Sequence, residues 1–139
     1  MRTDCFVYIS GPMTARETFC VEENCVVGAK MYFALLRRGI PAFCPHLSAF
    51  WPSAFTEIPY TDWIEYDFRV IDRCTHLLML PRWQESKGAV QEHAYALEKG
   101  VAITYSLAEL IQTLATRHGG AHEAGDPVVC RDVEGHPSR

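Results

Sequence analysis

Four short, mostly apolar runs, each closed by a turn residue, constrain the fold of this 139-residue chain more than any other feature. The runs are residues 5–9, 40–44, 76–80 and 101–105. Between and after them, apolar spacing and stop signals predict helices over residues 21–38, 63–74, 86–99 and 107–117. Apolar strands that alternate with helices are typical of a parallel sheet covered on both faces. The sequence therefore predicts one α/β domain, a doubly wound, flavodoxin- or Rossmann-like parallel sheet of four to five strands.

The last twenty or so residues differ in composition from the rest of the chain. From Gly119 onward Gly, His, Pro and charged residues dominate, and only residues 128–130 resemble a fifth strand. Such a segment lacks the apolar residues that a packed core needs. We expect a folded domain over residues 1–118 and a flexible C-terminal tail over residues 119–139.

Composition excludes several functional classes. Thirteen basic and seventeen acidic residues give a formal charge of −4, which argues against a nucleic-acid-binding surface. The longest apolar run, residues 31–36, is far shorter than the roughly 18 residues of a membrane helix. The six cysteines lack the paired close spacing of a zinc site, and the first residues do not resemble a secretory signal. We expect a cytoplasmic protein with reduced thiols, no membrane partner and no bound metal.

In doubly wound sheets, ligands bind beyond the carboxyl ends of the strands. The first such segment here contains Gly11, Pro12 and Met13. Gly11 allows the backbone to approach a ligand closely. The turn lacks both the three-glycine dinucleotide motif and the Gly-Lys-Ser/Thr end of a P-loop, so it indicates neither an NAD nor an ATP site. A tight turn with no ligand is the alternative interpretation.

A second candidate is the start of the predicted helix 86–99, with Ser86, Gly88 and Ala89. The free N–H groups and positive dipole at a helix start suit an anion such as a 5′-phosphate. The alternative is that Ser86 is an ordinary N-cap, a role in which serine is common.

Glu92 lies six residues into the same helix, flanked by Gly88 and Ala96. The stripe that we expect to face the sheet consists of Val90, Ala94 and Leu97. This pattern predicts that Glu92 lies on the other side of the helix, partly exposed. A solvated surface glutamate is the alternative, but the nearby anion site favours a functional carboxylate.

An aromatic stretch covers residues 50–66 and contains Trp51, Phe55, Tyr60 and Trp63. Flat side chains in a long connection are typical of a lid that stacks on a planar ligand such as a nucleobase. Core packing of some of these aromatics is the alternative. The acids nearby, which are individually weak signals, are Asp62, Asp67 and Asp72.

Two segments together, YISGPMT at residues 8–14 and LPRWQESKGAVQEHAYA at residues 80–96, resemble the nucleoside 2-deoxyribosyltransferase superfamily. They look closest to its small phage- and bacteria-associated branch, and next to the 2′-deoxynucleoside 5′-phosphate N-hydrolases. The resemblance runs over residues 5–105. Its most specific part is the spacing of Ser86, Gly88, Glu92 and Ala96. The chain departs from the branch at Ala15 and Arg82, where Gly is common.

The resemblance implies a role for individual residues. Glu92 falls on the nucleophile, Tyr8 on the tyrosine that orients it, and Asp67 on the second acid, near the leaving base. Gly11, Ser86 and Gly88 fall on positions that hold the 5′ end of the sugar. The remaining residues expected to bind substrate are Pro12, Met13, Ala89, Trp63 and Trp83.

The implied activity is hydrolysis, or transfer, of the N-glycosidic bond of a (deoxy)nucleoside 5′-monophosphate through a covalent glycosyl-glutamate intermediate. It needs neither a metal nor an organic cofactor. Ser86 favours a phosphate, because an acid at this position would repel one. The resemblance also implies a homo-oligomer whose neighbouring subunit completes the site. The alternatives are a non-catalytic nucleotide-sensing module, a nucleoside deoxyribosyltransferase and a hydrolase of NAD-type dinucleotides.

Overall fold

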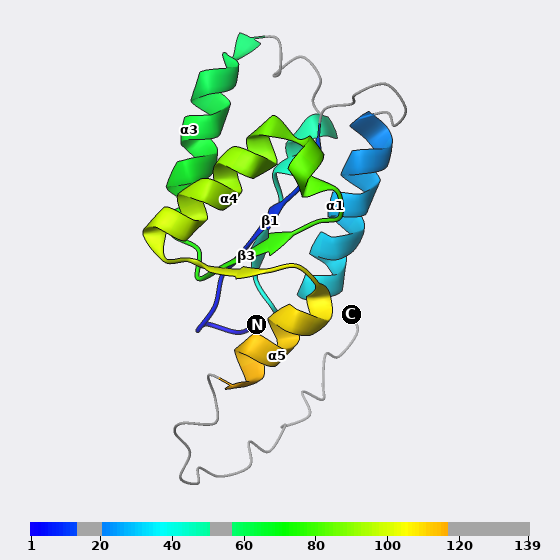
Figure 1. The fold of residues 1–139 in the computed structure, drawn as a ribbon. Helices are drawn as coiled ribbons and strands as arrows, with labels where there is room; N and C mark the ends of the chain where they lie inside the picture. The colour runs from blue at the N-terminus through cyan, green and yellow to red at the C-terminus, as the bar shows by residue number, and fades with distance from the viewer. Residues whose placement is uncertain (14–20, 51–56, 117–139) are drawn as a thin grey trace, which may run out of the picture.

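A computed structural model describes residues 1–13, 21–50 and 57–116 (Figure 1). The helices and strands follow in the order β1 (Val7–Ser10), α1 (Val21–Leu36), β2 (Ala42–Phe43), the 3-10 helix η1 (Pro45–Phe50), α3 (Tyr60–Ile71), β3 (His76–Met79), the 3-10 helix η2 (Trp83–Glu85), α4 (Lys87–Lys99), β4 (Ala102–Thr104) and α5 (Leu107–Thr116). All strand pairs are parallel, in the order β2-β1-β3-β4. The predicted doubly wound α/β fold is confirmed with four strands. The expected tail, with its candidate fifth strand, lies outside the described residues.

Local signals in the sequence fix the ends of the helices. The Ser86 side chain caps α4 at its start, and Gly100 ends it in a left-handed conformation with φ of 70°. Gly39 adopts the same left-handed conformation after α1, with φ of 68°. The strands are shorter than predicted, and α3 begins at Tyr60 instead of Trp63.

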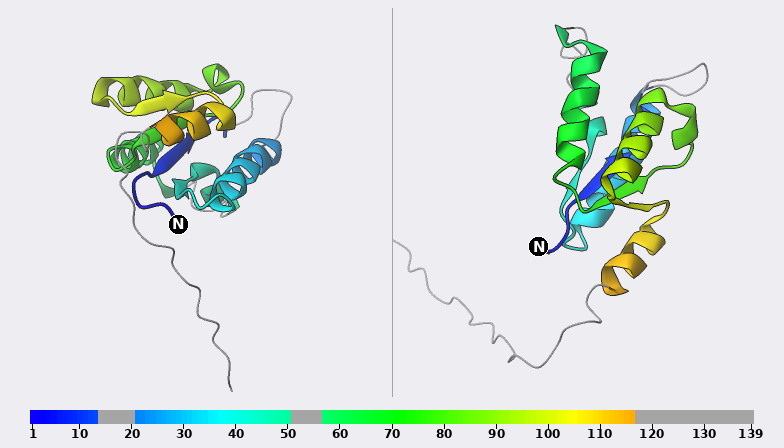
Figure 2. Two further views of the ribbon diagram at one scale, coloured as in Figure 1. Left: turned by 90° about the horizontal axis from the view of Figure 1, so that it is seen from below. Right: turned by 60° about the vertical axis from the view of Figure 1, so that its left-hand side comes forward.

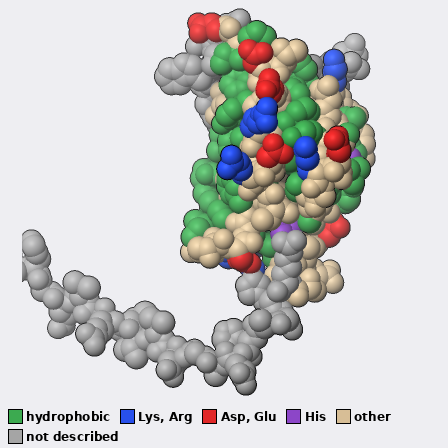
Figure 3. All heavy atoms as spheres, turned by 90° about the vertical axis from the view of Figure 1, so that its left-hand side faces the viewer, with side chains coloured by type: hydrophobic (Ala, Val, Ile, Leu, Met, Phe, Trp, Pro, Cys, Tyr) green, Lys and Arg blue, Asp and Glu red, His purple; other side chains and the backbone are tan. Residues whose placement is uncertain are grey.

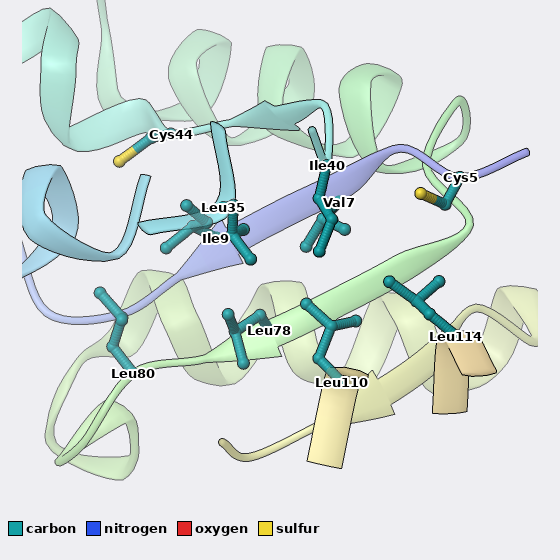
Figure 4. Close-up of a cluster of buried hydrophobic side chains, with 10 residues drawn as sticks. All are labelled: Cys5, Val7, Ile9, Leu35, Ile40, Cys44, Leu78, Leu80, Leu110 and Leu114. Atoms are coloured by element: carbon teal, nitrogen blue, oxygen red, sulfur yellow. The ribbon is translucent and has the colours of Figure 1, made fainter. Parts of the chain in front are cut away.

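Two hydrophobic layers cover the two faces of the sheet, with α1 and α5 on one side and α3 and α4 on the other (Figure 2). Side chains of a strand alternate between faces, so Val7 and Ile9 enter the first layer and Tyr8 the second. The buried members of the first layer, shown in Figure 4, are Cys5, Val7, Ile9, Leu35, Ile40, Cys44, Leu78, Leu80, Leu110 and Leu114. Those of the second are Tyr8, Ile71, Cys74, Leu77, Met79, Ala89 and Ala96.

The prediction of which face of α4 meets the sheet is wrong. Val90 and Leu97 are 42% and 61% exposed, whereas Glu92 is buried between Ala89 and Ala96. Small side chains at positions 89 and 96 let the helix lie close to the strands. Glu92 tolerates burial there because β1 supplies hydroxyl partners for its carboxylate, as described below. A hydrophobic pattern treats every glutamate as outward-facing and cannot register such partners.

The outer surface on the α3 side mixes acidic and basic side chains among hydrophobic ones, and neither charge dominates the view (Figure 3). Among the helices of the described ranges, none combines the length and the apolar character that a membrane crossing requires.

Helix α1 packs against η1 through an unusually close contact between Gly28 and His46. His46 is fully buried. Its Nε2 atom lies 2.9 Å from the carbonyl oxygen of Pro12, and since a carbonyl only accepts, Nε2 carries the proton and donates. A Cβ atom at position 28 would stand 2.5 Å from the ring Cγ of His46. The absence of a side chain at Gly28 thus lets His46 reach the loop after β1.

We expect Gly28→Ala to lower the free energy of unfolding by about 1–3 kcal/mol, because the added methyl group would overlap a fully enclosed ring. Gly88→Ala is the matched control. A Cβ atom there would meet nothing closer than 3.5 Å, so its free energy of unfolding should stay the same or rise slightly. Urea denaturation of both variants measures the difference, and equal stability would contradict the contact.

Candidate active site

A cavity of about 930 Å³ opens at the carboxyl ends of three strands. Its walls come from the loop after β1, the end of β2 with η1, the helices α1 and α3, and the segment from η2 into α4. This volume is typical of sites for small molecules and cofactors. The segment after β4, also an expected position, does not contribute to the lining, because β4 is the edge strand on the far side of β3.

The carboxylate of Glu92, only 5% exposed, lies at the bottom of this cavity and is bound at both oxygens. Tyr8 donates its hydroxyl proton to Oε1 over 2.9 Å, and Ser10 donates to Oε2 over 2.5 Å. Tyr8 and Ser10 are two residues apart on β1, so the strand presents both hydroxyls to the same face. Their spacing fixes the orientation of the carboxylate in the cavity.

Asp67, from α3, is a second buried carboxyl group beside Glu92 and also lines the cavity. Burial raises the pKa of Glu92 to about 7; the charge of Asp67 adds to the shift, and the hydrogen bonds from Ser10 and Tyr8 oppose it. Burial also raises the pKa of Asp67 to about 6, while hydrogen bonding with Tyr8 and Glu92 opposes that shift. The two carboxyls therefore titrate as a pair that shares one proton near neutral pH.

Tyr8 remains a hydrogen-bond donor throughout this range. Burial, followed by the charge of Glu92, raises the pKa of its phenol well above the ordinary value. The ring lies within the second hydrophobic layer and does not line the cavity. Tyr8 therefore donates its hydrogen bond to Glu92 from the side of the sheet and not from the cavity.

The loop after β1 lines the cavity with Gly11, Pro12 and Met13, as expected. It is fixed at two points. A Cβ atom at Gly11 would stand 2.7 Å from the Cβ of Leu80, and His46 donates to the carbonyl of Pro12. Burial lowers the pKa of His46, so its ring is neutral near pH 7.

The start of α4 forms another wall, with Ser86, Gly88 and Ala89 all in the lining. Ser86 is also an N-cap, because its Oγ accepts the backbone N–H of Ala89 over 3.3 Å. The two interpretations of this residue are therefore compatible.

Two cations, Arg82 and Lys87, flank the start of α4 and line the cavity. Arg82 has φ of 63°, a left-handed conformation that suits Gly at this position. The ammonium of Lys87 lies 5.7 Å from the ring centroid of Tyr60.

Aromatic side chains of α3 and β2 line the adjoining wall. Tyr60 and Trp63 lie there as expected, joined by Phe43 and Tyr66. The rings of Phe43 and Trp63 each meet Tyr66 edge to face, with centroids 6.1 and 6.3 Å apart. Of the rest of the aromatic stretch, Trp51 and Phe55 fall outside the described residues.

Trp83 does not line the cavity, contrary to expectation. Its indole stacks on His93, with ring centroids 4.4 Å apart and planes at 18°, and packs against the second hydrophobic layer. The turn of η2 directs this side chain along the outside of α4.

Sequence reasoning missed Asn24 and His46, and it placed Ser10 in the turn after the first strand without assigning it a role. The period of β1 could have identified Ser10, since it shares a face with Tyr8. Asn24 and His46 carry no such signal, because their positions depend on how α1 and η1 pack. Within the described ranges, no group of three or more His, Cys, Asp or Glu residues could hold a metal ion.

The raised pKa of Glu92 predicts how stability depends on pH. Its protonated form is favoured by folding, so this contribution is complete below about pH 4.5, the unfolded value, and is lost as pH rises through about 7. Glu92→Gln removes it, and we expect the variant to gain on the order of 2 kcal/mol relative to wild type between about pH 4.5 and 8. Urea denaturation across this range measures the gain, and parallel pH profiles of the two proteins would contradict the buried charge.

Comparison with curated proteins finds no match, and comparison with solved structures finds none either. One family model, described as a domain of unknown function (DUF4406), matches residues 5–105. The matched range includes β1, α3 and α4, which carry the carboxyl pair and its hydroxyl partners. Since the match covers well over half of the sequence, the chain belongs to the DUF4406 family.

Proposed function

We propose that this protein cleaves the N-glycosidic bond of a (deoxy)nucleoside 5′-monophosphate and releases the free base and (deoxy)ribose 5-phosphate. The observation that carries the proposal is the Glu92 carboxylate, buried, held at both oxygens by Tyr8 and Ser10, and placed next to Asp67 in a cavity of nucleotide-compatible size. The resemblance to the nucleoside 2-deoxyribosyltransferase superfamily points the same way.

In the first step, a Glu92 oxygen attacks the anomeric carbon of the sugar. The bond from this carbon to the base nitrogen breaks, its electron pair stays on the base, and protonated Asp67 gives the base a proton. The raised pKa values of both carboxyls keep one proton on the pair near neutral pH. The higher value is that of Glu92, so this proton passes from Glu92 to Asp67 before the attack. Hydrogen bonds from Tyr8 and Ser10 hold the attacking group in place.

In the second step, water attacks the anomeric carbon of the glycosyl ester. The bond to the Glu92 oxygen breaks, the carboxylate leaves with the electron pair, and the proton of the water passes to Asp67. Both groups return to their starting states. Transfer differs only in that a second base replaces water, and neither route uses a metal or an organic cofactor.

The phosphate of the substrate is assigned to the start of α4. The N–H groups of Lys87 and Gly88, the hydroxyl of Ser86 and the ammonium of Lys87 favour an anion there. Arg82 adds positive charge to this wall, although it is paired with Glu85 over 3.2 Å. The aromatic wall with Trp63 and Tyr66 suits the flat base.

Self-association and a cytoplasmic location are also part of the proposal. Glu92 faces its own sheet and is held by its own β1, so the orientation of this carboxylate does not itself require a second subunit. Exposed apolar side chains on α1, among them Val26, Val27 and Phe33, remain in favour of a homo-oligomer. Three buried cysteines of the described chain, Cys5, Cys44 and Cys74, are free thiols, as in a reducing compartment.

We expect Glu92→Gln to reduce base release from nucleoside monophosphates by at least about a thousandfold, because an amide cannot form the glycosyl ester. Glu98→Gln, an exposed position on the same helix, is the matched control and should keep full activity. Chromatographic detection of free base measures both. If the wild type binds nucleotides and releases no base, the protein is a sensing module instead.

A charged side chain at position 86 distinguishes the proposed phosphate contact of Ser86 from its function as an N-cap. We expect wild type to prefer monophosphates to nucleosides in kcat/KM, and Ser86→Asp to reduce this preference at least about tenfold through like-charge repulsion. Asp is as good an N-cap as Ser, so the fold should keep its stability. Ser86→Ala should lose about 1 kcal/mol of stability from the missing cap and weaken the preference less. Equal use of nucleoside and monophosphate by wild type would reject the phosphate assignment.

A further inference from the structure

Asn24, in the second turn of α1, is a polar residue of the cavity that the proposed chemistry does not use. It is 9% exposed, and it lines the cavity on the side opposite the helices α3 and α4. Its side-chain amide makes no hydrogen bond to another residue of the described chain, whereas Glu92 is bound at both oxygens. Among the described residues, the amide therefore leaves its donor and its acceptor to the cavity.

Asparagine is not the residue that α1 favours at this position, because it is a weaker helix former than leucine or alanine. The amide of Asn24 is open to the cavity. A ligand that supplies one acceptor and one donor can therefore bind this amide without displacing a hydrogen bond to another described residue.

The charge distribution of the cavity indicates which part of a nucleotide meets Asn24. Among the described residues, the charged lining side chains come from α3, from α4 and from residues 82–85, and they are Asp62, Asp67, Arg82, Glu85, Lys87 and Glu92. The described lining residues on the α1 side are uncharged and include Pro12, Pro45 and Ser48. A phosphate is favoured near the two cations, so the group at Asn24 is a neutral one.

From these observations, and resting on the proposed function, we infer that Asn24 recognises the nucleobase. Its carbonyl oxygen accepts from an exocyclic amino group, and its NH₂ donates to the adjacent ring nitrogen. Adenine and cytosine present an amino group beside a ring nitrogen, and guanine and uracil present a ring N–H beside a carbonyl, so each base offers the amide a donor next to an acceptor. The ring of Phe43, at the end of β2, contacts Tyr66 in the aromatic wall and offers the base an apolar contact from that side.

Replacing the amide by a carboxylate gives a sharp test, because an ionised carboxylate at position 24 would only accept hydrogen bonds. Two adjacent donors, as guanine has at N1 and N2, then become the favoured partner. We expect Asn24→Asp to raise the affinity for GMP relative to AMP by about tenfold or more, in the range that bidentate base contacts provide. Asn24→Leu keeps the volume without hydrogen bonding and should weaken the binding of AMP and CMP.

Dissociation constants for AMP, GMP, CMP and UMP, measured by calorimetry in a Glu92→Gln background, avoid turnover. Thermal unfolding of each variant shows that the fold is retained. An unchanged ratio of GMP to AMP affinity in Asn24→Asp, with equal losses for all four nucleotides, would overturn the inference. Base release by wild type is scored separately, so that its absence would refute the proposed activity while the affinity ratio still decides the role of Asn24.

Discussion

Burial of the Glu92 carboxylate against β1 is the interaction on which the rest of the site depends. A carboxylate can be buried in a hydrophobic layer only if its oxygens receive hydrogen bonds, and Tyr8 and Ser10 supply one each. This contact determines which face of α4 meets the sheet, and with it the position of the first helical turn over the cavity. Burial also raises the pKa of Glu92 and of Asp67. It therefore determines both the geometry of the site and the protonation of its two carboxyls near neutral pH.

The start of the loop after β1 is also fixed by specific contacts, which come from the opposite face of the sheet. Gly11 touches Leu80, and His46 reaches the carbonyl of Pro12 only because Gly28 has no side chain. Both contacts involve residues distant in sequence, from the end of β3 and from η1. Residues 11–13, the described part of this loop, are therefore positioned by the sheet and by the packing of α1 against η1.

Much of this architecture could be predicted from the sequence, because strand runs, turn residues and helix stops act locally. The three residues expected to carry the chemistry come together: Asp67 and Glu92 line one cavity, and Tyr8 donates a hydrogen bond to Glu92 from the side of the sheet. The exposure of Glu92 was predicted wrongly, since helical periodicity ignores hydrogen-bond partners on a strand 84 residues away in sequence. Trp83, His46 and Asn24 were misplaced or missed because their environment is created by packing between elements, which no local pattern encodes.

The cavity lies where the two hydrophobic layers meet, over the carboxyl edge of the sheet. Asn24 belongs to the α1 layer and Glu92 to the α4 layer, and β1 separates them. A ligand in contact with both Asn24 and Glu92 would connect two layers that are otherwise joined only through the strands. Its binding energy would add to the free energy of global unfolding, because separating either layer would release it. Amide hydrogens of α1 and α4 would then exchange more slowly together, as a single cooperative unit.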